Sequence, residues 1–320
     1  MNNNLDLKDR RILLELDKNC RQTNSEIAKI VGLSKDSIAY RIKYLENKKI
    51  LSGYRTIIDI SKLGYIQHRV ALSFIDINSK IIEEIVLYLK SKKGVWAIAH
   101  NEGEWDFAIV YSSKTSLEFY NLFEDFMNKF RNIVKDKLIT ELIKFDELER
   151  NYLVPEEKIV IKSKKIKNKE SKINIDEMDL KILNILSRNA RKKLIEIAKE
   201  LNISSMLTLQ RIKRLEQNNI ILQYKADINV LELNRDYYGI KINLSSYSQK
   251  KEILKEIYSF PEMTAAVYSI NGYDIEFDVE ILGTKDYHRI INNLRDKFSS
   301  IREIKSIRTI KYYHTGYELE

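Results

Sequence analysis

Residues 27–46 read IAKIVGLSKDSIAYRIKYLE, and residues 197–216 of the same chain read IAKELNISSMLTLQRIKRLE. The two stretches agree at both ends and differ in the middle, where residues 35–40 are replaced by residues 205–210. A shift of 170 residues extends this agreement without a gap to 5–64 and 175–234. Because this period is far longer than the about 20–50 residues of solenoid repeats, the sequence indicates a duplicated unit of two domains.

Each copy opens with a pattern typical of three short helices. In copy one, the first helix is predicted over residues 9–18 and the second over 24–31, since apolar residues recur there at helical spacing. Gly32 and its counterpart Asn202 follow the second helix. Both residue types tolerate positive φ, so we predict that each ends its helix in a tight turn.

A third helix is predicted to begin after Ser34 in copy one and after Ser204 in copy two, and to run to about residues 48 and 218. Serine is a preferred N-cap because its side-chain oxygen accepts a hydrogen bond from a free backbone N–H of the first turn. Helix, short turn and helix form a helix-turn-helix, whose second member can lie in the major groove of DNA. The cations on the third helix favour this function over that of an ordinary helical bundle.

A groove-bound helix accounts for the altered middle of the repeated stretch. The N-terminal residues of such a helix reach base edges, whereas flanking cations meet phosphates. The predicted DNA contacts come from the third helix of each copy and its N-cap, and they are Ser34, Lys35, Asp36, Ser37, Tyr40, Arg41, Lys43, Ser204, Ser205, Thr208, Gln210, Arg211, Lys213 and Arg214. The sequence leaves open whether Met206 and Leu207 touch thymine methyl groups or mark a helix that binds DNA weakly or contacts protein.

After each helical block the apolar periodicity changes from 3.6 residues to 2. The order strand, helix, strand, strand, helix, strand is predicted in both copies, which is the ferredoxin-like βαββαβ motif with a four-stranded antiparallel sheet and helices on one face. The predicted fold class is therefore α+β, a tandem duplication of a winged-type helix-turn-helix DNA-binding domain and a ferredoxin-like domain. The predicted domains are the first helix-turn-helix (1–64), the first ferredoxin-like domain (65–153), a linker (154–174), the second helix-turn-helix (175–235) and the second ferredoxin-like domain (236–320).

The central hairpin of each βαββαβ domain carries a glycine, an aromatic residue and an aspartate, in NEGEWDF and in INGYDI. One interpretation is a turn that returns the chain to the sheet. The other is a small-molecule pocket bordered by Gly103 and Asp106 in copy one and by Gly272 and Asp274 in copy two. Copy two is one residue shorter here, so the two pockets cannot be identical.

The predicted open face of the sheet also differs between the copies. Ala108 and Val110 in copy one correspond to Glu276 and Asp278 in copy two. Burying a carboxylate is costly unless a partner charge compensates. We therefore expect paired charges wherever the second face is buried, and we judge the first face the better one for association.

Charge and composition narrow the class of protein. Of the net charge of +9, the two helical blocks contribute +5 (1–64) and +3 (175–235), and the lysine-rich linker contributes +4. No long uncharged apolar run and no secretory signal are seen, so we expect a soluble cytoplasmic protein without a membrane partner. The single Cys20 excludes an intrachain disulfide, and the four histidines are scattered. We predict no metal site, no cofactor and no enzymatic activity.

Taken together, the motif LSKDSIAYRIKYLE, the following GYRTIIDISKLGY and the βαββαβ domain with GEWDF resemble the Lrp/AsnC family of transcription regulators. The resemblance covers both copies and leaves out only the linker. It implies double-stranded DNA as partner, an intrachain pseudo-dimer, further association into homo-oligomers, and an amino-acid-like effector bound beside the hairpin loops.

Two other functions are kept as alternatives. Siroheme decarboxylases are similar in architecture, and their histidine-bearing segment would fall at GVWAIAHNEGEWDF, which contains His100. Such an enzyme needs several proton donors or cations around the substrate carboxylates, and this stretch has no nearby arginine. The third function is a modulator of other family members that does not itself bind DNA.

Overall fold

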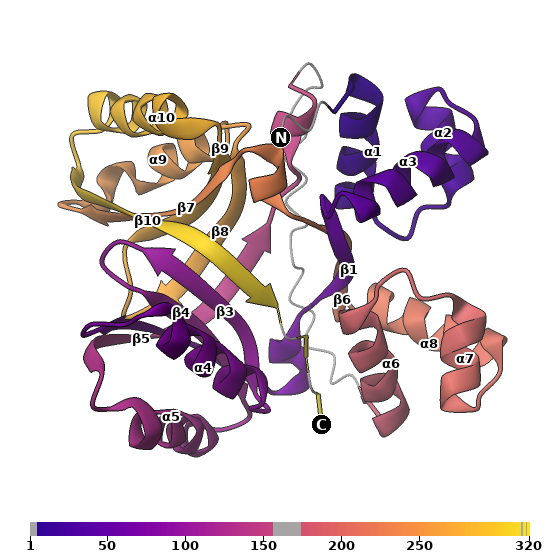
Figure 1. Cartoon of the computed structure of the whole chain (residues 1–320), viewed down its shortest axis with the longest axis horizontal. Coiled ribbons are helices and arrows are strands. Elements are labelled where there is room, and N and C mark those ends of the chain that lie inside the picture. The colour runs from indigo at the N-terminus through magenta and orange to yellow at the C-terminus, as the bar shows by residue number, and fades with distance from the viewer. Residues whose placement is uncertain (1–4, 156–173, 315, 318) are drawn as a thin grey trace. The chain divides into compact units, whose positions relative to one another are not determined.

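The structure is a computed structural model that describes residues 5–155, 174–314, 316–317 and 319–320 (Figure 1). The chain folds into two compact units, each of which combines corresponding parts of both copies. The helical unit takes its described residues from Met1–Leu63, Glu149–Asn234 and Gly316–Glu320, and the sheet unit from Gly64–Leu148 and Arg235–Thr315. Within the described residues, no helix has the length and apolar character needed to cross a membrane.

The helical unit contains the two predicted helix-turn-helix motifs. The helices of copy one are α1 (Leu7–Lys18), α2 (Asn24–Val31) and α3 (Lys35–Asn47), and those of copy two are α6 (Glu177–Arg188), α7 (Leu194–Leu201) and α8 (Ser205–Gln217). Helix α1 begins two residues before the predicted start because Asp6 caps it. The Asp6 carboxylate accepts a hydrogen bond from the Asp9 amide at 2.8 Å, which satisfies a free donor of the first turn.

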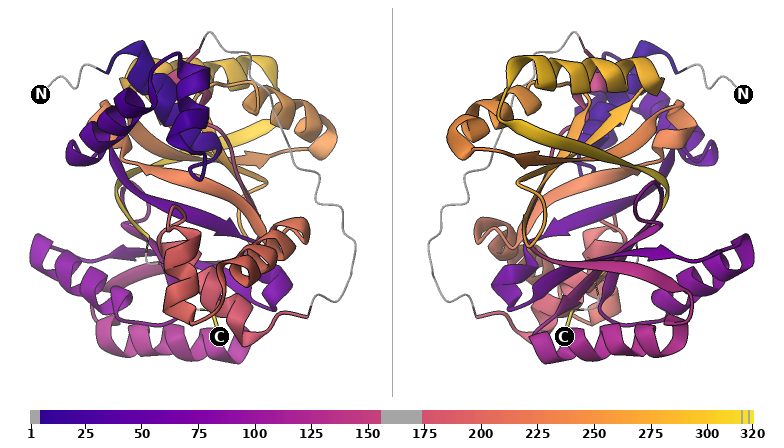
Figure 2. Two further views of the ribbon diagram at one scale, coloured as in Figure 1. Left: turned by 90° about the vertical axis from the view of Figure 1, so that its right-hand side faces the viewer. Right: turned by 90° about the vertical axis from the view of Figure 1, so that its left-hand side faces the viewer.

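The two copies are joined in this unit by an antiparallel ribbon of β1 (Leu51–Ile58) and β6 (Ile221–Ile228) (Figure 2). Each copy packs its first helix on the other copy's strand, α1 on β6 and α6 on β1. The Cys20 amide donates to the Tyr224 carbonyl at 2.9 Å, and the Ala190 amide donates to the Tyr54 carbonyl at the same distance. The predicted intrachain pseudo-dimer therefore has a physical basis in crossed packing and backbone hydrogen bonds.

The segment after the first ferredoxin-like domain returns to the helical unit. Tyr152, Leu153 and Val154 are buried in the core around α1 and α2. The prediction that the linker starts at residue 154 is therefore wrong at its first residue. Burying the apolar side chain of Val154 removes it from water, which stabilises the fold. Residues 156–173 of the predicted linker lie outside the described residues.

The sheet unit contains the two predicted βαββαβ domains. Copy one forms β2 (Ile66–Phe74), α4 (Ser79–Lys90), β3 (Val95–Glu102), β4 (Phe107–Ser113), α5 (Ser116–Phe130) and β5 (Val134–Glu147). Copy two forms β7 (Asp236–Leu244), α9 (Lys250–Ile257), β8 (Met263–Ile270), β9 (Ile275–Ile281), α10 (Gly283–Lys297) and β10 (Ile301–His314). Each copy buries an apolar core between its strands and its own two helices.

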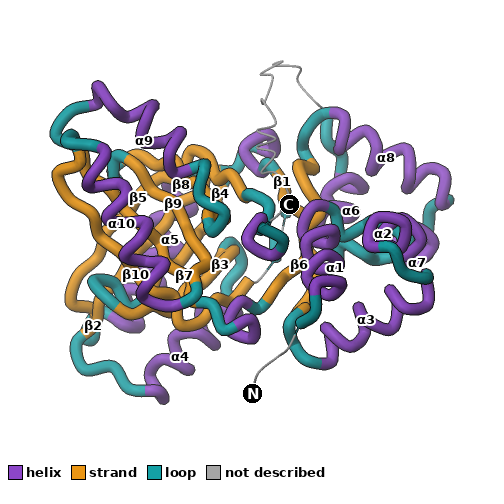
Figure 3. Tube along the Cα trace, turned by 90° about the horizontal axis from the view of Figure 1, so that it is seen from above, coloured by secondary structure: helices purple, strands orange, loops and turns teal. Residues whose placement is uncertain are grey.

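Among the described residues, the strands of this unit form one closed sheet in the order β10-β3-β4-β2-β5-β8-β9-β7. Its strands are orange in Figure 3. The closure was not predicted. It arises because β5 and β10 run past their own sheet, so that their second halves pair with the other copy: β5 pairs with β8, and β10 with β3. Pairing removes the exposed strand edges that two separate four-stranded sheets would have.

The expectation of paired charges on the second face is confirmed. Glu276 of β9 is 4% exposed and lies 2.7 Å from the guanidinium of Arg69 on β2. The partner of the acidic face is thus the face of copy one, which supplies the compensating cation. Asp278, the second carboxylate of this face, accepts a hydrogen bond from the Tyr237 hydroxyl at 2.6 Å.

Candidate nucleic-acid interface

The turn before each third helix is built as the sequence predicted. Gly32 has φ 70° and Asn202 has φ 54°, both in the left-handed region. Ser34 then caps α3 by accepting from the Ser37 amide at 3.1 Å, and Ser204 caps α8 by accepting from the Leu207 amide at 3.1 Å. These two features fix where each third helix starts and therefore which residues occupy its exposed first turn.

Two aspartates at the start of the first helix, one of them its N-cap, bind an arginine of the third helix in each copy. In copy one, the Arg41 guanidinium lies 2.6 Å from Asp9 and 2.8 Å from Asp6. In copy two, the corresponding Arg211 lies 2.9 Å from Asp179 and 2.8 Å from Asp176. We call each set the carboxylate clamp; it comprises Asp6, Asp9 and Arg41 in copy one, and Asp176, Asp179 and Arg211 in copy two.

The ion pairs of the clamp favour the charged forms of their side chains. The hydrogen bond to Asp9 raises the pKa of Arg41, and the hydrogen bond from Arg211 lowers the pKa of Asp176. Copy two adds a second cation, since Arg214 also binds Asp179. Charge-assisted hydrogen bonds to a carboxylate are strong, so these arginines fix the orientation of the third helix. The predicted phosphate contact of Arg41 and Arg211 would have to be made by guanidinium groups that already bind carboxylates.

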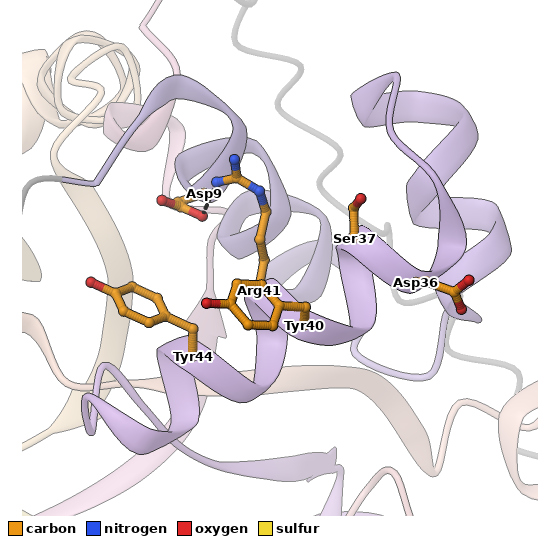
Figure 4. Close-up of a pocket in the computed structure, with 6 residues that line it drawn as sticks. All are labelled: Asp9, Asp36, Ser37, Tyr40, Arg41 and Tyr44. Atoms are coloured by element: carbon orange, nitrogen blue, oxygen red, sulfur yellow. Dashed lines mark hydrogen bonds and ion pairs between the residues drawn. The ribbon is translucent and has the colours of Figure 1, made fainter.

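The exposed side of α3 carries an open hollow. It is lined by Asp9 of α1 and by residues of α3, namely Asp36, Ser37, Tyr40, Arg41 and Tyr44. Figure 4 shows Arg41 directed to Asp9 at its edge and the rings of Tyr40 and Tyr44 along the same side of the helix. Tyr40 is 74% exposed, and Lys35 and Lys43 are exposed as well. The face therefore offers aromatic edges, hydroxyls and two exposed lysines.

The exposed side of α8 has a different chemistry. Met206 is 64% exposed and Leu207 37%, and both lie in the first turn. Gln210 and Lys213 are exposed farther along the helix. Thr208 was predicted to contact DNA, but it is fully buried and its hydroxyl donates to the Ser204 carbonyl at 3.0 Å. We correct that prediction, because a side chain packed in the core cannot reach a base edge.

The aspartates of the clamp were missed at the level of sequence. Asp6 and Asp9 recur as Asp176 and Asp179, so the repeat itself contained the signal. Their role depends on the packing of α1 against α3, which brings together residues that lie 32 and 35 positions apart in the chain. Tyr44 was also not singled out, although it lines the hollow.

The two hairpin aspartates have the same structural role. The carboxylate of Asp106 accepts a hydrogen bond from the Phe74 amide at 2.8 Å, and that of Asp274 from the Leu244 amide at 2.7 Å. Asp274 also accepts from the Tyr247 hydroxyl. Gly103 has φ 130°, and a Cβ there would lie 3.6 Å from the carbonyl oxygen of Ser306. Both aspartates thus hold the hairpin loop against the end of the first strand of their domain.

His100 lies on β3 with its ring stacked on Phe107, the centroids 5.1 Å apart. Burial lowers its pKa, and the carboxylates of Asp106 and Glu102 oppose this effect. The sheet register brings Lys311 of β10 opposite His100, a neighbour that the local sequence could not reveal. Among the described residues, no group of three or more His, Cys, Asp or Glu is arranged to hold a metal ion.

Comparison with known families supports the two helix-turn-helix motifs separately. Residues 5–46 match the AsnC-type helix-turn-helix domain, and residues 175–221 match the winged helix-turn-helix DNA-binding family. The same two segments contain the third helices whose faces differ.

Curated relatives resemble one copy of the repeat in length. The chain is 42% identical over 150 residues to the leucine-responsive regulatory protein of Haemophilus influenzae, a match that covers 45% of this chain and 90% of the relative. It is 31% identical over 138 residues to the regulatory protein AsnC of the same organism, covering 43% of this chain and 90% of the relative.

A solved structure matches the whole tandem architecture. The crystal structure of the siroheme decarboxylase NirDL aligns with a TM-score of 0.62 at 14% identity and covers 95% of this chain and 91% of that chain. At this identity the likeness concerns the fold alone. The relatives that share more sequence are regulators, and nearly the full length of each is matched. The chain therefore belongs to the Lrp/AsnC family of transcription regulators.

Proposed function

We propose that this regulator recognises an asymmetric DNA site, in which α3 and α8 read two half-sites of different sequence. The observation that carries the proposal is that each helix is held by the same carboxylate clamp while the exposed first turns differ. A common scaffold with unlike reading residues is what two different half-sites require, since the N-terminal part of a recognition helix contacts base edges.

In copy one, we assign the base contacts to Lys35, Asp36, Ser37 and Tyr40 and the phosphate contacts to Ser34 and Lys43. Arg41 acts as a positioning residue, because its guanidinium binds Asp6 and Asp9. In copy two, Ser205, Met206, Leu207 and Gln210 face the bases, with Lys213 on the phosphates. The apolar pair Met206 and Leu207 suits thymine methyl groups, which are the apolar feature of the major groove.

Binding-site selection with the full-length protein and random duplexes is the direct test. We expect an operator with two dissimilar halves about one helical turn apart. A palindromic operator would contradict the proposal that α3 and α8 recognise different sequences. An operator with a single half-site would instead support the alternative in which α8 contacts another protein through Met206 and Leu207.

Salt dependence tests the DNA contact itself. We expect affinity for the selected duplex to fall steeply with salt, and the slope of log K against log salt to decrease by about 1 in Lys43→Ala. Lys129→Ala is the matched control, because Lys129 is an exposed lysine on α5 that pairs with Glu84. Affinity that does not change with salt would refute the proposal.

We further propose that the hairpin loops at 103–106 and 272–274 border the site of an amino-acid-like effector. In this proposal Asp106 and Asp274 act by shaping the loops, since their carboxylates accept hydrogen bonds from backbone amides. Calorimetric titration with the twenty amino acids tests it. We expect Asp106→Asn to weaken binding several-fold, and a panel without any binder would remove the effector from the proposed function.

A further inference from the structure

The two copies meet in the sheet unit around a buried cluster of four charges. It consists of Arg69 on β2 from copy one, and of Lys241 on β7 with Glu276 and Asp278 on β9 from copy two. Arg69 binds Glu276 at 2.7 Å, and the two side chains are 14% and 3% exposed. The Ser269 hydroxyl donates to the same carboxylate at 2.6 Å. We call this set the four-charge cluster.

The other two members are enclosed as well. Lys241 is 8% exposed, its ammonium lies 5.1 Å from the centroid of the Tyr273 ring, and burial together with the charge of Arg69 lowers its pKa to about 8. Burial raises the pKa of Asp278 to about 6. Two cations and two carboxylates thus share a poorly solvated site, where an unbalanced charge is costly.

Equivalent positions of the two copies carry different residues, so the cluster has no second counterpart. The sheet register places Arg69 opposite Val110 and Ala71 opposite Ala108 in copy one. The same positions in copy two are Gly239 opposite Asp278 and Lys241 opposite Glu276. Gly239 leaves room for its neighbour, since a Cβ there would lie 3.4 Å from a carboxylate oxygen of Asp278. The cluster therefore exists once, and its charges come unequally from the two copies.

The charge count depends on which copies pair. Copy one brings one cation to the cluster, and copy two brings one cation and two carboxylates, so the pair of unlike copies is formally neutral. Two copies of the first kind would bury two arginines without either of these two carboxylates. Two copies of the second kind would bury four carboxylates against two lysines.

The helical unit carries an independent asymmetry, which bears on the pairing of copy two with itself. Asp17 of α1 lies 3.4 Å from Lys225 of β6, and the two side chains are 0% and 2% exposed. The position equivalent to Asp17 in copy two is Ser187. A pairing of copy two with itself would place Ser187 against Lys225, without the carboxylate that Asp17 supplies.

We propose that these buried charges make the two copies obligate unlike partners: the association face of copy one fits copy two and rejects a second copy one. The chain then always presents α3 together with α8. Pairs that carry two identical recognition helices are excluded by the cost of unpaired buried charge. This inference concerns assembly and does not depend on which DNA sequence is read.

Transposing the charged positions tests the proposal in the full-length chain. One variant makes both faces like copy one, with Gly239→Arg, Lys241→Ala, Glu276→Ala and Asp278→Val. A second variant makes both faces like copy two, with Arg69→Gly, Ala71→Lys, Ala108→Glu and Val110→Asp. The transposed variant carries all eight substitutions, so that it exchanges the faces and restores the unlike pair. Because all variants keep the copies in one chain, the melting temperature reports how well each combination of faces packs.

We expect each four-substitution variant to melt at least about 5 °C below the wild type. The transposed variant, with twice as many substitutions, should melt clearly above both. If it melts no higher than they do, local packing and not charge matching decides the pairing, and the proposal is overturned. The proposal is also overturned if all three variants melt at the same temperature as the wild type.

Discussion

Asp9 of α1 and Arg41 of α3 lie 2.6 Å apart, and the same pair recurs as Asp179 and Arg211 at 2.9 Å. The Asp9 side chain is 8% exposed, so its charge is largely removed from water and depends on the arginine. A cation on the third helix of a helix-turn-helix can therefore hold the helix in position instead of contacting a DNA phosphate. The two roles differ in what a substitution changes.

For Asp9→Asn we expect a loss of about 1–3 kcal/mol in the free energy of unfolding, because the charged partner of Arg41 is removed. DNA binding should weaken while its salt slope stays the same, since no phosphate contact is lost. Lys43→Ala should do the opposite, with unchanged stability and a shallower slope. Urea unfolding and fluorescence anisotropy at several salt concentrations separate the two. A shallower slope in Asp9→Asn would count against the positioning role.

The buried carboxylate of Asp17 gives a second prediction. It binds the Arg150 guanidinium at 2.6 Å and the Lys225 ammonium at 3.4 Å, and its own side chain is 0% exposed. Asp17→Ala leaves these two cations without that carboxylate, and we expect a loss of about 3–5 kcal/mol in urea unfolding. Lys181→Ala is the control, since its pair with Glu177 is exposed; it should change stability by less than about 0.5 kcal/mol. Equal effects would show that burial does not govern these pairs.

The local features of the fold could be predicted from sequence because they depend on neighbours in the chain. Ser34, Gly32 and their counterparts fix the third helices through caps and turns within a few residues. Features that depend on the meeting of the two copies could not be predicted. The alternation of Ala108 and Val110 indicated a strand face, but nothing in the sequence identified Arg69 as the partner of Glu276.

The same limit applies to the candidate site. The exposed Tyr40 and Lys43 were correctly placed on the third helix by helical spacing. Thr208 corresponds to the buried Ile38 of copy one. Because threonine is polar, it was wrongly predicted to contact DNA from a position that is buried. Its hydroxyl is satisfied by the backbone of Ser204, four residues earlier, which lets a threonine occupy that position.

The architecture shared with a siroheme decarboxylase gives a prediction about His100. The ring stacks on Phe107 and the sheet register places it opposite Lys311, so it packs against neighbours of its own sheet. We expect no change of the Soret band when siroheme is added to the protein. A shift of the band that disappears in His100→Ala would contradict this expectation and favour a siroheme-decarboxylase-like activity. His288→Ala, on α10, is the control for a nonspecific contact.

The pKa of Asp278 predicts a pH dependence of stability. Burial raises it to about 6, above the value of about 3.9 of an unfolded aspartate. The folded state therefore binds the proton more tightly, so this group contributes stability below about pH 4 that is lost as the pH rises to about 6. Asp278→Asn cannot ionise and should not show this loss.

Between pH 4.0 and pH 7.5, we expect the free energy of unfolding of the wild type to fall by roughly 2 kcal/mol relative to that of Asp278→Asn. Urea unfolding at the two pH values measures the difference, and titrating groups that do not interact with Asp278 cancel because both proteins contain them. Glu84→Gln, which alters an exposed carboxylate, should differ little from the wild type at either pH. If the difference between the two proteins is the same at both pH values, the carboxylate is not destabilised by its surroundings. The charge of Asp278 would then be fully compensated by Arg69 and Lys241, and the hydrogen bond from Tyr237 would be its main contribution to the sheet.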